Sequence, residues 1–87
     1  YHPHADEMVQ LAMGMMGLFV IHPKDGDHVD RDYALLLHNF ALHPGTYRPD
    51  PSVMQDFDLW TFNSKVYPAI EPMVARTGER VRIRVGN

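Results

Sequence analysis

The sequence contains no cysteine, no long apolar run and no excess of basic residues, and each absence excludes a class of protein. Without cysteine, these 87 residues hold no disulfide, zinc finger, thiolate–copper site or cysteine nucleophile. No apolar run approaches the roughly 20 residues that a membrane-spanning helix needs. The formal net charge is −3 at pH 7, so there is no basic footprint for nucleic acid. We therefore expect neither a membrane nor nucleic acid among the partners.

The length allows one small domain or parts of two. A domain this short buries a modest fraction of its surface and has little stability to spare. The opening Tyr1-His2-Pro3-His4 is not an initiator sequence. The apolar segment Met8–Ile21 has no basic region before it, so it is not a signal peptide. We therefore expect both ends to be cuts through a longer polypeptide, with the rest of that polypeptide as the first partner.

Short apolar segments punctuated by proline and glycine predict an all-β fold. The continuous apolar run at Leu18–Ile21 predicts a strand buried on both faces. One or two helical turns are expected within residues 8–16, ended by Gly14 and Gly17. A second strand is expected at residues 31–42, where both alternating faces are largely apolar.

The second half of the chain predicts two further strands. Residues 58–62 are strand-like and include Trp60, which we expect in a core, and Asn63-Ser64 follow as a hairpin-type turn. Residues 80–85 then alternate charged and β-branched side chains at every step. We expect the apolar side chains to point inward and the arginines outward. The inward set is Val81, Ile83 and Val85.

Three prolines and a glycine within residues 43–52 predict a loop or linker between domains. We accordingly expect residues 1–43 to be the C-terminal part of a first domain. Residues 44–56 would be the linker, and residues 57–87 the N-terminal part of a second domain. Strands separated by such turns are typical of a sandwich or barrel.

His2 and His4 form a His-x-His pair. In an extended segment, residues two apart project to the same face with Cα atoms about 6.5–7 Å apart, which suits ligands of one metal or of a close metal pair. Neutral imidazole binds copper and zinc well. The chain has six histidines, so such a pair also arises by chance, and the spacing alone leaves both interpretations open. Surface positions or local hydrogen bonds are expected for His22, His28, His38 and His43.

Two longer strings resemble the multicopper oxidase family. The Tyr-His-Pro-His of residues 1–4, followed by Gly-Met-Met-Gly-Leu-Phe-Val-Ile at 14–21, resembles the end of that family's first cupredoxin domain. The Leu-Trp-Thr-Phe-Asn-Ser-Lys-Val-Tyr-Pro of residues 59–68 and the segment 78–87 resemble the opening of the next domain. Ser64 stands where the family usually has glycine. The strings lie in family order and together cover most of the chain.

The resemblance implies an incomplete cupredoxin-like Greek-key β-sandwich made of parts of two domains. It also implies copper as the cofactor, with His2 and His4 each binding one copper of the type 3 pair in a trinuclear cluster. The remaining cluster ligands and the type 1 copper, which needs a cysteine, would lie in the missing part. Pro3 stands where some related cupredoxins place that cysteine, so no type 1 copper is expected in the first domain.

The implied activity is laccase-like: one-electron oxidation of a small reductant or metal ion, coupled to reduction of dioxygen to water. The 87 residues alone are expected to be inactive. The absence of a type 1 site from the first domain favours a two-domain oxidase, and such an oxidase implies a homotrimer. The family also implies a periplasmic or extracellular location. The alternative is a non-catalytic copper-binding or structural cupredoxin module, distinguished by the absence of a downstream His-Cys-His segment. Asp6 and Glu7 are either proton relays or solvated turn acids.

Overall fold

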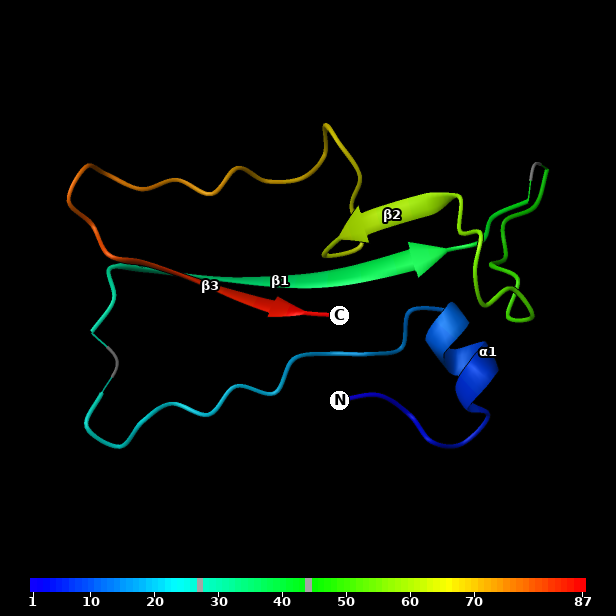
Figure 1. The fold of residues 1–87 in the computed structure, drawn as a ribbon, viewed down its shortest axis with the longest axis horizontal. Coiled ribbons are helices and arrows are strands. Elements are labelled where there is room, and N and C mark those ends of the chain that lie inside the picture. Colours follow the sequence, from blue (N-terminus) through cyan, green and yellow to red (C-terminus); the bar gives the residue numbers. More distant parts are fainter. Residues whose placement is uncertain (27, 44) are drawn as a thin grey trace.

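The computed structural model describes residues 1–26, 28–43 and 45–87, which contain a short helix and a small β-sheet (Figure 1). The helix is α1 (Glu7–Ala12), and the strands are β1 (Arg31–Phe40), β2 (Leu59–Phe62) and β3 (Val81–Gly86). The three strands form one mixed sheet in the order β2-β1-β3. The β-rich character expected from the sequence is confirmed, as are the strands expected at 31–42, 58–62 and 80–85.

β1 is the central strand because it pairs along both edges. It pairs antiparallel with β2, with Phe40 opposite Leu59, and parallel with β3, with Arg31 opposite Val81. Residues 44–56 therefore run between two hydrogen-bonded strands of one sheet. The division into domains at 1–43, 44–56 and 57–87 stays a prediction. Pro44 of that linker, and Asp27 of the turn expected at 24–27, lie outside the described residues.

A tight turn follows β2, as the sequence predicts. Phe62 and Lys65 donate their main-chain N–H groups to each other's carbonyl oxygens at 3.0 Å. Asn63 and Ser64 have φ values of 51° and 62°, the left-handed region that a two-residue hairpin turn of this kind requires. Glycine adopts this conformation most readily, so Ser64 holds a conformation that favours glycine.

The side chain of Asn63 extends the pairing of this turn with β1. Its Oδ1 accepts a hydrogen bond from the main-chain nitrogen of Leu36 at 2.8 Å. Its Nδ2 donates to the carbonyl oxygen of Ala34 at 2.9 Å. Beyond the end of β2, the side-chain amide of Asn63 thus makes the hydrogen bonds with β1 that a further strand residue would make.

Ion pairs connect β1 with β3 and the turn before it. Arg84 donates from Nε to Asp32 Oδ1 at 2.9 Å and from a terminal nitrogen to Oδ2 at 2.8 Å. Arg31 binds the two oxygens of Glu79 at 3.0 and 3.2 Å. The guanidinium groups lower the pKa of both Asp32 and Glu79. Such two-point contacts fix geometry as well as charge.

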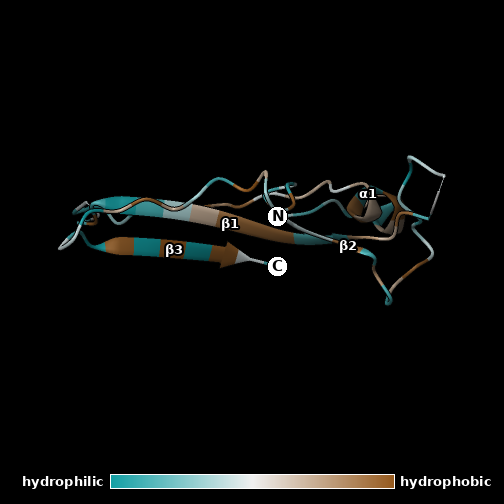
Figure 2. Ribbon diagram, turned by 90° about the horizontal axis from the view of Figure 1, so that it is seen from above, coloured by the Kyte–Doolittle hydropathy of each residue, from teal (hydrophilic) through white to brown (hydrophobic). Residues whose placement is uncertain are grey.

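Although Arg80 is exposed as predicted, the face of β3 that is predicted to point inward is not buried within the described chain. Its apolar side chains are 43, 50 and 61% exposed at Val81, Ile83 and Val85, whereas Arg82 and Arg84 are half-buried. The arginines lie on the face where Asp32 of β1 offers a charge partner. In the described part of the chain, no second layer covers the apolar face of β3, and the alternating bands of the strand stand out in Figure 2.

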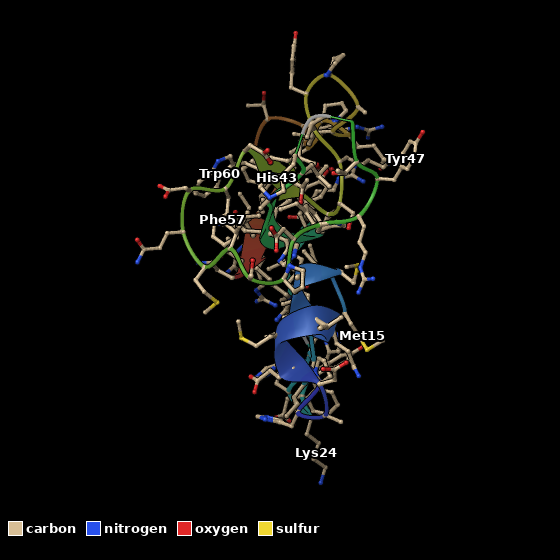
Figure 3. The ribbon with its side chains drawn as sticks, turned by 90° about the vertical axis from the view of Figure 1, so that its right-hand side faces the viewer. Met15, Lys24, His43, Tyr47, Phe57 and Trp60 are labelled. Carbon is tan, nitrogen blue, oxygen red and sulfur yellow. The ribbon has the colours of Figure 1, made fainter. Side chains whose placement is uncertain are left out.

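The core is correspondingly small. Among the described residues, the buried ones are Ala41 and Thr61, and no large side chain is fully buried. The radius of gyration is 16.2 Å, against about 12 Å for a compact domain of this length. The predicted core position of Trp60 is wrong, since 65% of it is exposed. Its ring instead contacts Phe57 edge-on, with centroids 6.4 Å apart, and Figure 3 shows both residues on the opposite side of the view from Tyr47.

The buried strand expected at Leu18–Ile21 is also wrong. This segment has no regular secondary structure, and Phe19 and Ile21 are 79 and 78% exposed. A strand needs a hydrogen-bonding neighbour on at least one edge, and in the described chain this segment pairs with none of the three strands. The apolar run alone therefore does not suffice to make a strand.

Candidate metal centre

Residues 1–17, here called the histidine loop, return on themselves so that Tyr1 meets Gly17. The main-chain nitrogen of Tyr1 donates to the Gly17 carbonyl at 2.7 Å, and the Gly17 nitrogen donates to the Tyr1 carbonyl at 2.9 Å. A Cβ atom on Gly17 would lie 2.6 Å from the Tyr1 ring. Glycine thus permits the close approach that closes the loop.

Helix α1 occupies the middle of the histidine loop. Gln10 donates its N–H to the Asp6 carbonyl at 3.0 Å in the first turn, and Glu7 is the first helical residue. Gly14, which has a φ of 84°, lies just after the helix, and the sequence predicts that the helix ends at this glycine. No helix among the described residues is long and apolar enough to cross a membrane.

The histidine loop brings the two predicted ligands together and adds Glu7. The ring centroids of His2 and His4 are 4.6 Å apart. Glu7 Oε1 lies 3.7 Å from His2 Nδ1, and Glu7 Oε2 lies 3.9 Å from His4 Nδ1. The side chains of His2, His4 and Glu7 are 44, 79 and 45% exposed, respectively. Within the described ranges, these three residues form the group of potential ligands close enough to share a metal ion.

The donor set fits the copper that the family resemblance implies. Imidazole nitrogen is a favourable ligand for copper and zinc, and carboxylate oxygen completes many such sites. Each donor is reachable from solvent, so an ion can enter without opening a core. The arrangement therefore supports the binding of a transition-metal ion such as copper or zinc.

A cavity of about 420 Å³ opens beside His2, between the histidine loop, β1 and the end of β3. His38 of β1 also lines this cavity. The sequence predicts a surface position or a local hydrogen bond for His38, and this prediction is wrong for the ring nitrogen Nε2. That nitrogen is buried and has no hydrogen-bond partner within the described residues. Burial lowers the pKa of His38, partly opposed by a hydrogen bond with the Leu11 main chain. The rings of His38 and Phe40 pack edge-on, with their centroids 4.4 Å apart. His38 is thus a packed group in which burial favours the neutral imidazole.

The other histidines lie apart from the candidate centre. His22 and His28 are exposed. His43 Nε2 lies 2.9 Å from Asp50 Oδ2, which confirms the expected local hydrogen bond. Asp50 Oδ1 also accepts from the Ser52 hydroxyl at 2.6 Å and the Ser52 main-chain nitrogen at 2.9 Å. The Ser52 contacts, followed by His43, lower the pKa of Asp50 to about 2.

The contacts of Asp50 organise a loop and do not activate a nucleophile. The Ser52 hydroxyl donates to the carboxylate, while His43 contacts the other oxygen of that carboxylate. A serine nucleophile instead needs the imidazole as its own hydrogen-bond partner. The carboxylate of Asp50 therefore holds His43 and Ser52 on its two oxygens, and the Ser52 hydroxyl bonds to the carboxylate and not to the imidazole.

No family model, curated protein or solved structure matches the chain. The likeness to multicopper oxidases accordingly rests on the motifs in the sequence. Sequence reasoning assigned no ligand role to Glu7, although a signal was present. The spacing His-x-His-x-x-Glu places a carboxylate in the first turn of a helix directly after an extended pair of histidines.

Proposed function

We propose that this chain is part of a laccase-like multicopper oxidase, which couples one-electron oxidation of a small reductant or metal ion to reduction of dioxygen to water. In this proposal the β-rich chain belongs to a cupredoxin-like Greek-key sandwich completed by the rest of the polypeptide. Copper is the cofactor, and a homotrimer exported to the periplasm or outside the cell is the expected form.

The observation that carries the proposal is the meeting of two imidazoles from a His-x-His segment. The centroids of His2 and His4 lie 4.6 Å apart on a loop closed by two main-chain hydrogen bonds. This segment and the turn at Asn63–Ser64 are also two of the places where the sequence resembles the oxidase family. The left-handed φ of Ser64 is what the glycine usual at that position would supply.

The residues of this chain would act by holding and orienting metal. His2 and His4 would each hold one copper of the type 3 pair through a ring nitrogen. Pro3 between them restricts the backbone, and the contacts of Tyr1 with Gly17 anchor the segment. The copper cluster, when bound, supplies electrons to dioxygen. Exposed apolar side chains of β3 would be covered by the missing layer of the sandwich.

The test is copper content and dioxygen consumption in the longest form of the polypeptide that can be purified, with its intact mass measured. We expect enough copper for a trinuclear cluster and a type 1 site, and dioxygen consumption with a small reductant. The substitutions His2→Ala and His4→Ala should abolish consumption, and His28→Ala, at an exposed site away from the pair, should leave it unchanged. Full activity without His2 and His4 would contradict the proposal.

A non-catalytic copper-binding or structural cupredoxin module is the second candidate. The exposure of all three donors in the described chain favours simple binding as much as catalysis. This candidate predicts copper binding that depends on His2 and His4 without dioxygen consumption in the full polypeptide. A structural module with chance histidines predicts no stabilisation on addition of copper, because a ligand of the folded state must stabilise it.

A further inference from the structure

We infer that the histidine loop by itself forms a mononuclear site for one divalent transition-metal ion, bound by a ring nitrogen of His2, a ring nitrogen of His4 and the carboxylate of Glu7. This inference goes beyond the proposed function because it needs no cluster and no other part of the polypeptide. It also assigns Glu7 a role as a ligand, which a type 3 pair does not require.

The distances among the three donors suit a single ion. The Glu7 oxygens lie 3.7 and 3.9 Å from the two Nδ1 atoms, which is too long for hydrogen bonds. Two donors bound at 2.0–2.2 Å to one tetrahedral ion are separated by roughly 3.3 Å. The two separations from Glu7 therefore need to shorten by only a few tenths of an ångström, and all three ligand atoms lie within 4.8 Å of one another. His2 Nδ1 also lies 3.2 Å from the Pro3 carbonyl oxygen, a contact that binding through this nitrogen would replace.

Glu7 differs from the other paired glutamates of the described chain in what surrounds its carboxylate. Glu71 pairs with Lys65 at 2.9 Å, and Glu79 pairs with Arg31 at 3.0 Å. The carboxylate of Glu7 faces two imidazoles instead. These partners carry no permanent positive charge of the kind that Lys65 and Arg31 supply, whereas a divalent cation between the three groups would compensate the carboxylate.

The loop holds the donors in place before the ion arrives. The main-chain contacts of Tyr1 with Gly17 anchor one side of the histidine pair. On the other side, α1 positions Glu7 in its first turn, three residues after His4. Less ordering is then needed on binding, and preorganisation of this kind increases affinity.

The donor set also indicates which ions bind. Two histidines and a glutamate form a ligand set of zinc sites that keep a fourth position open for water. The same nitrogen and oxygen donors bind Cu²⁺ more tightly than Zn²⁺, following the general order of divalent affinities. We therefore expect one Zn²⁺ or one Cu²⁺ per chain, with Cu²⁺ displacing Zn²⁺.

Calorimetric titration of the 87-residue chain with Zn²⁺ tests the site. We expect one ion per chain and an affinity at least about tenfold lower in Glu7→Gln. The matched control Glu71→Gln, which alters an exposed glutamate outside the loop, should bind like the unchanged chain. Circular dichroism verifies that both variants keep the same secondary structure. Unchanged affinity in Glu7→Gln, or no binding by the unchanged chain, would overturn the inference.

Electron paramagnetic resonance of the Cu²⁺-loaded chain separates one ion from a coupled pair. A spin count equal to the bound copper, at one per chain, supports the mononuclear site. Two coppers per chain with no signal would overturn it. Binding that needs His2 and His4 but not Glu7 overturns this inference and leaves the proposed oxidase intact. Binding that needs Glu7, without dioxygen consumption by the full polypeptide, supports the inference and contradicts the oxidase.

Discussion

The histidine loop and the three-stranded sheet are held together in different ways. The histidine loop is closed by two main-chain hydrogen bonds between Tyr1 and Gly17, and its candidate ligands are exposed. The sheet has hydrogen-bond ladders along both edges of β1, the amide of Asn63 and paired charges such as Asp32 with Arg84. Figure 1 shows the two regions side by side, with the loop running below the sheet.

This difference indicates that order in the two regions comes from different sources. Regions with few buried contacts and exposed hydrogen bonds open locally at low free-energy cost. A metal bound by the histidine loop would therefore supply order that packing does not. The ladders of the sheet involve no residue of the histidine loop, although His38 of β1 hydrogen-bonds to the Leu11 main chain. We therefore expect the two regions to respond largely independently to perturbation.

The largest effect is expected at Asn63, in the turn that follows β2 and is bonded to β1. Asn63→Ala removes two side-chain hydrogen bonds, each contributing about 1 kcal/mol, and places alanine in a left-handed conformation that costs about 1 kcal/mol more. We expect a loss of about 3 kcal/mol in the free energy of unfolding, measured by urea denaturation. Asn63→Gly, which tolerates the positive φ, should lose about 2 kcal/mol through the hydrogen bonds alone. Zn²⁺ affinity should stay unchanged, and a parallel loss would mean that loop and sheet are coupled.

The second-largest effect is the stabilisation of the histidine loop when Zn²⁺ binds. At a free Zn²⁺ concentration of about 100 times the dissociation constant, binding stabilises the bound conformation by about 2.7 kcal/mol. Hydrogen exchange of the Gly17 N–H should slow by up to about a hundredfold, because this group closes the loop. The Phe62 N–H, bonded to Lys65 in the sheet hairpin, serves as the internal control and should not change. Equal slowing at both amides would show that the regions are not independent.

A smaller effect is expected for Ser64→Gly. Ser64 has a φ of 62°, and glycine removes the left-handed strain while adding flexibility to the unfolded chain. We expect a net stabilisation of about 0.5–1 kcal/mol in thermal or urea unfolding. Ser52→Gly is the matched comparison, because it removes a hydrogen bond to Asp50 without relieving a positive φ, and it should destabilise. Destabilisation by Ser64→Gly would contradict this account of the turn.

The smallest effect is the acid dependence contributed by Asp50. Its pKa is lowered from 3.8 to about 2 in the folded chain, so the folded state favours the charged carboxylate. The stabilising contribution is complete above the unfolded value of 3.8 and is lost as the pH falls through about 2. Because Asp50 is accessible to solvent, added salt should weaken the effect. Unfolding experiments on Asp50→Asn should show a difference from the unchanged chain that is constant above pH 3.8 and shrinks below it. A constant difference down to pH 2 would contradict the lowered pKa.

The sequence by itself determined the local features whose causes lie within a few residues. The alternation at 80–85 predicts β3, and Asn63-Ser64 predicts the turn, because period and turn chemistry act over neighbouring positions. Gly14 predicts the end of α1 for the same reason. The His-x-His spacing predicts that His2 and His4 share one side of the chain, and the structure brings their rings together.

Only the tertiary structure decided what depends on distant partners. It makes β1 the neighbour of both β2 and β3, leaves Leu18–Ile21 without a strand partner and directs Arg84 toward Asp32. It also places Glu7 beside the two histidines. The physical reason is that the repeat of a helix or a strand determines which of its side chains share a face. Which face is covered, and by what, depends on the segments that pack there from elsewhere in the chain.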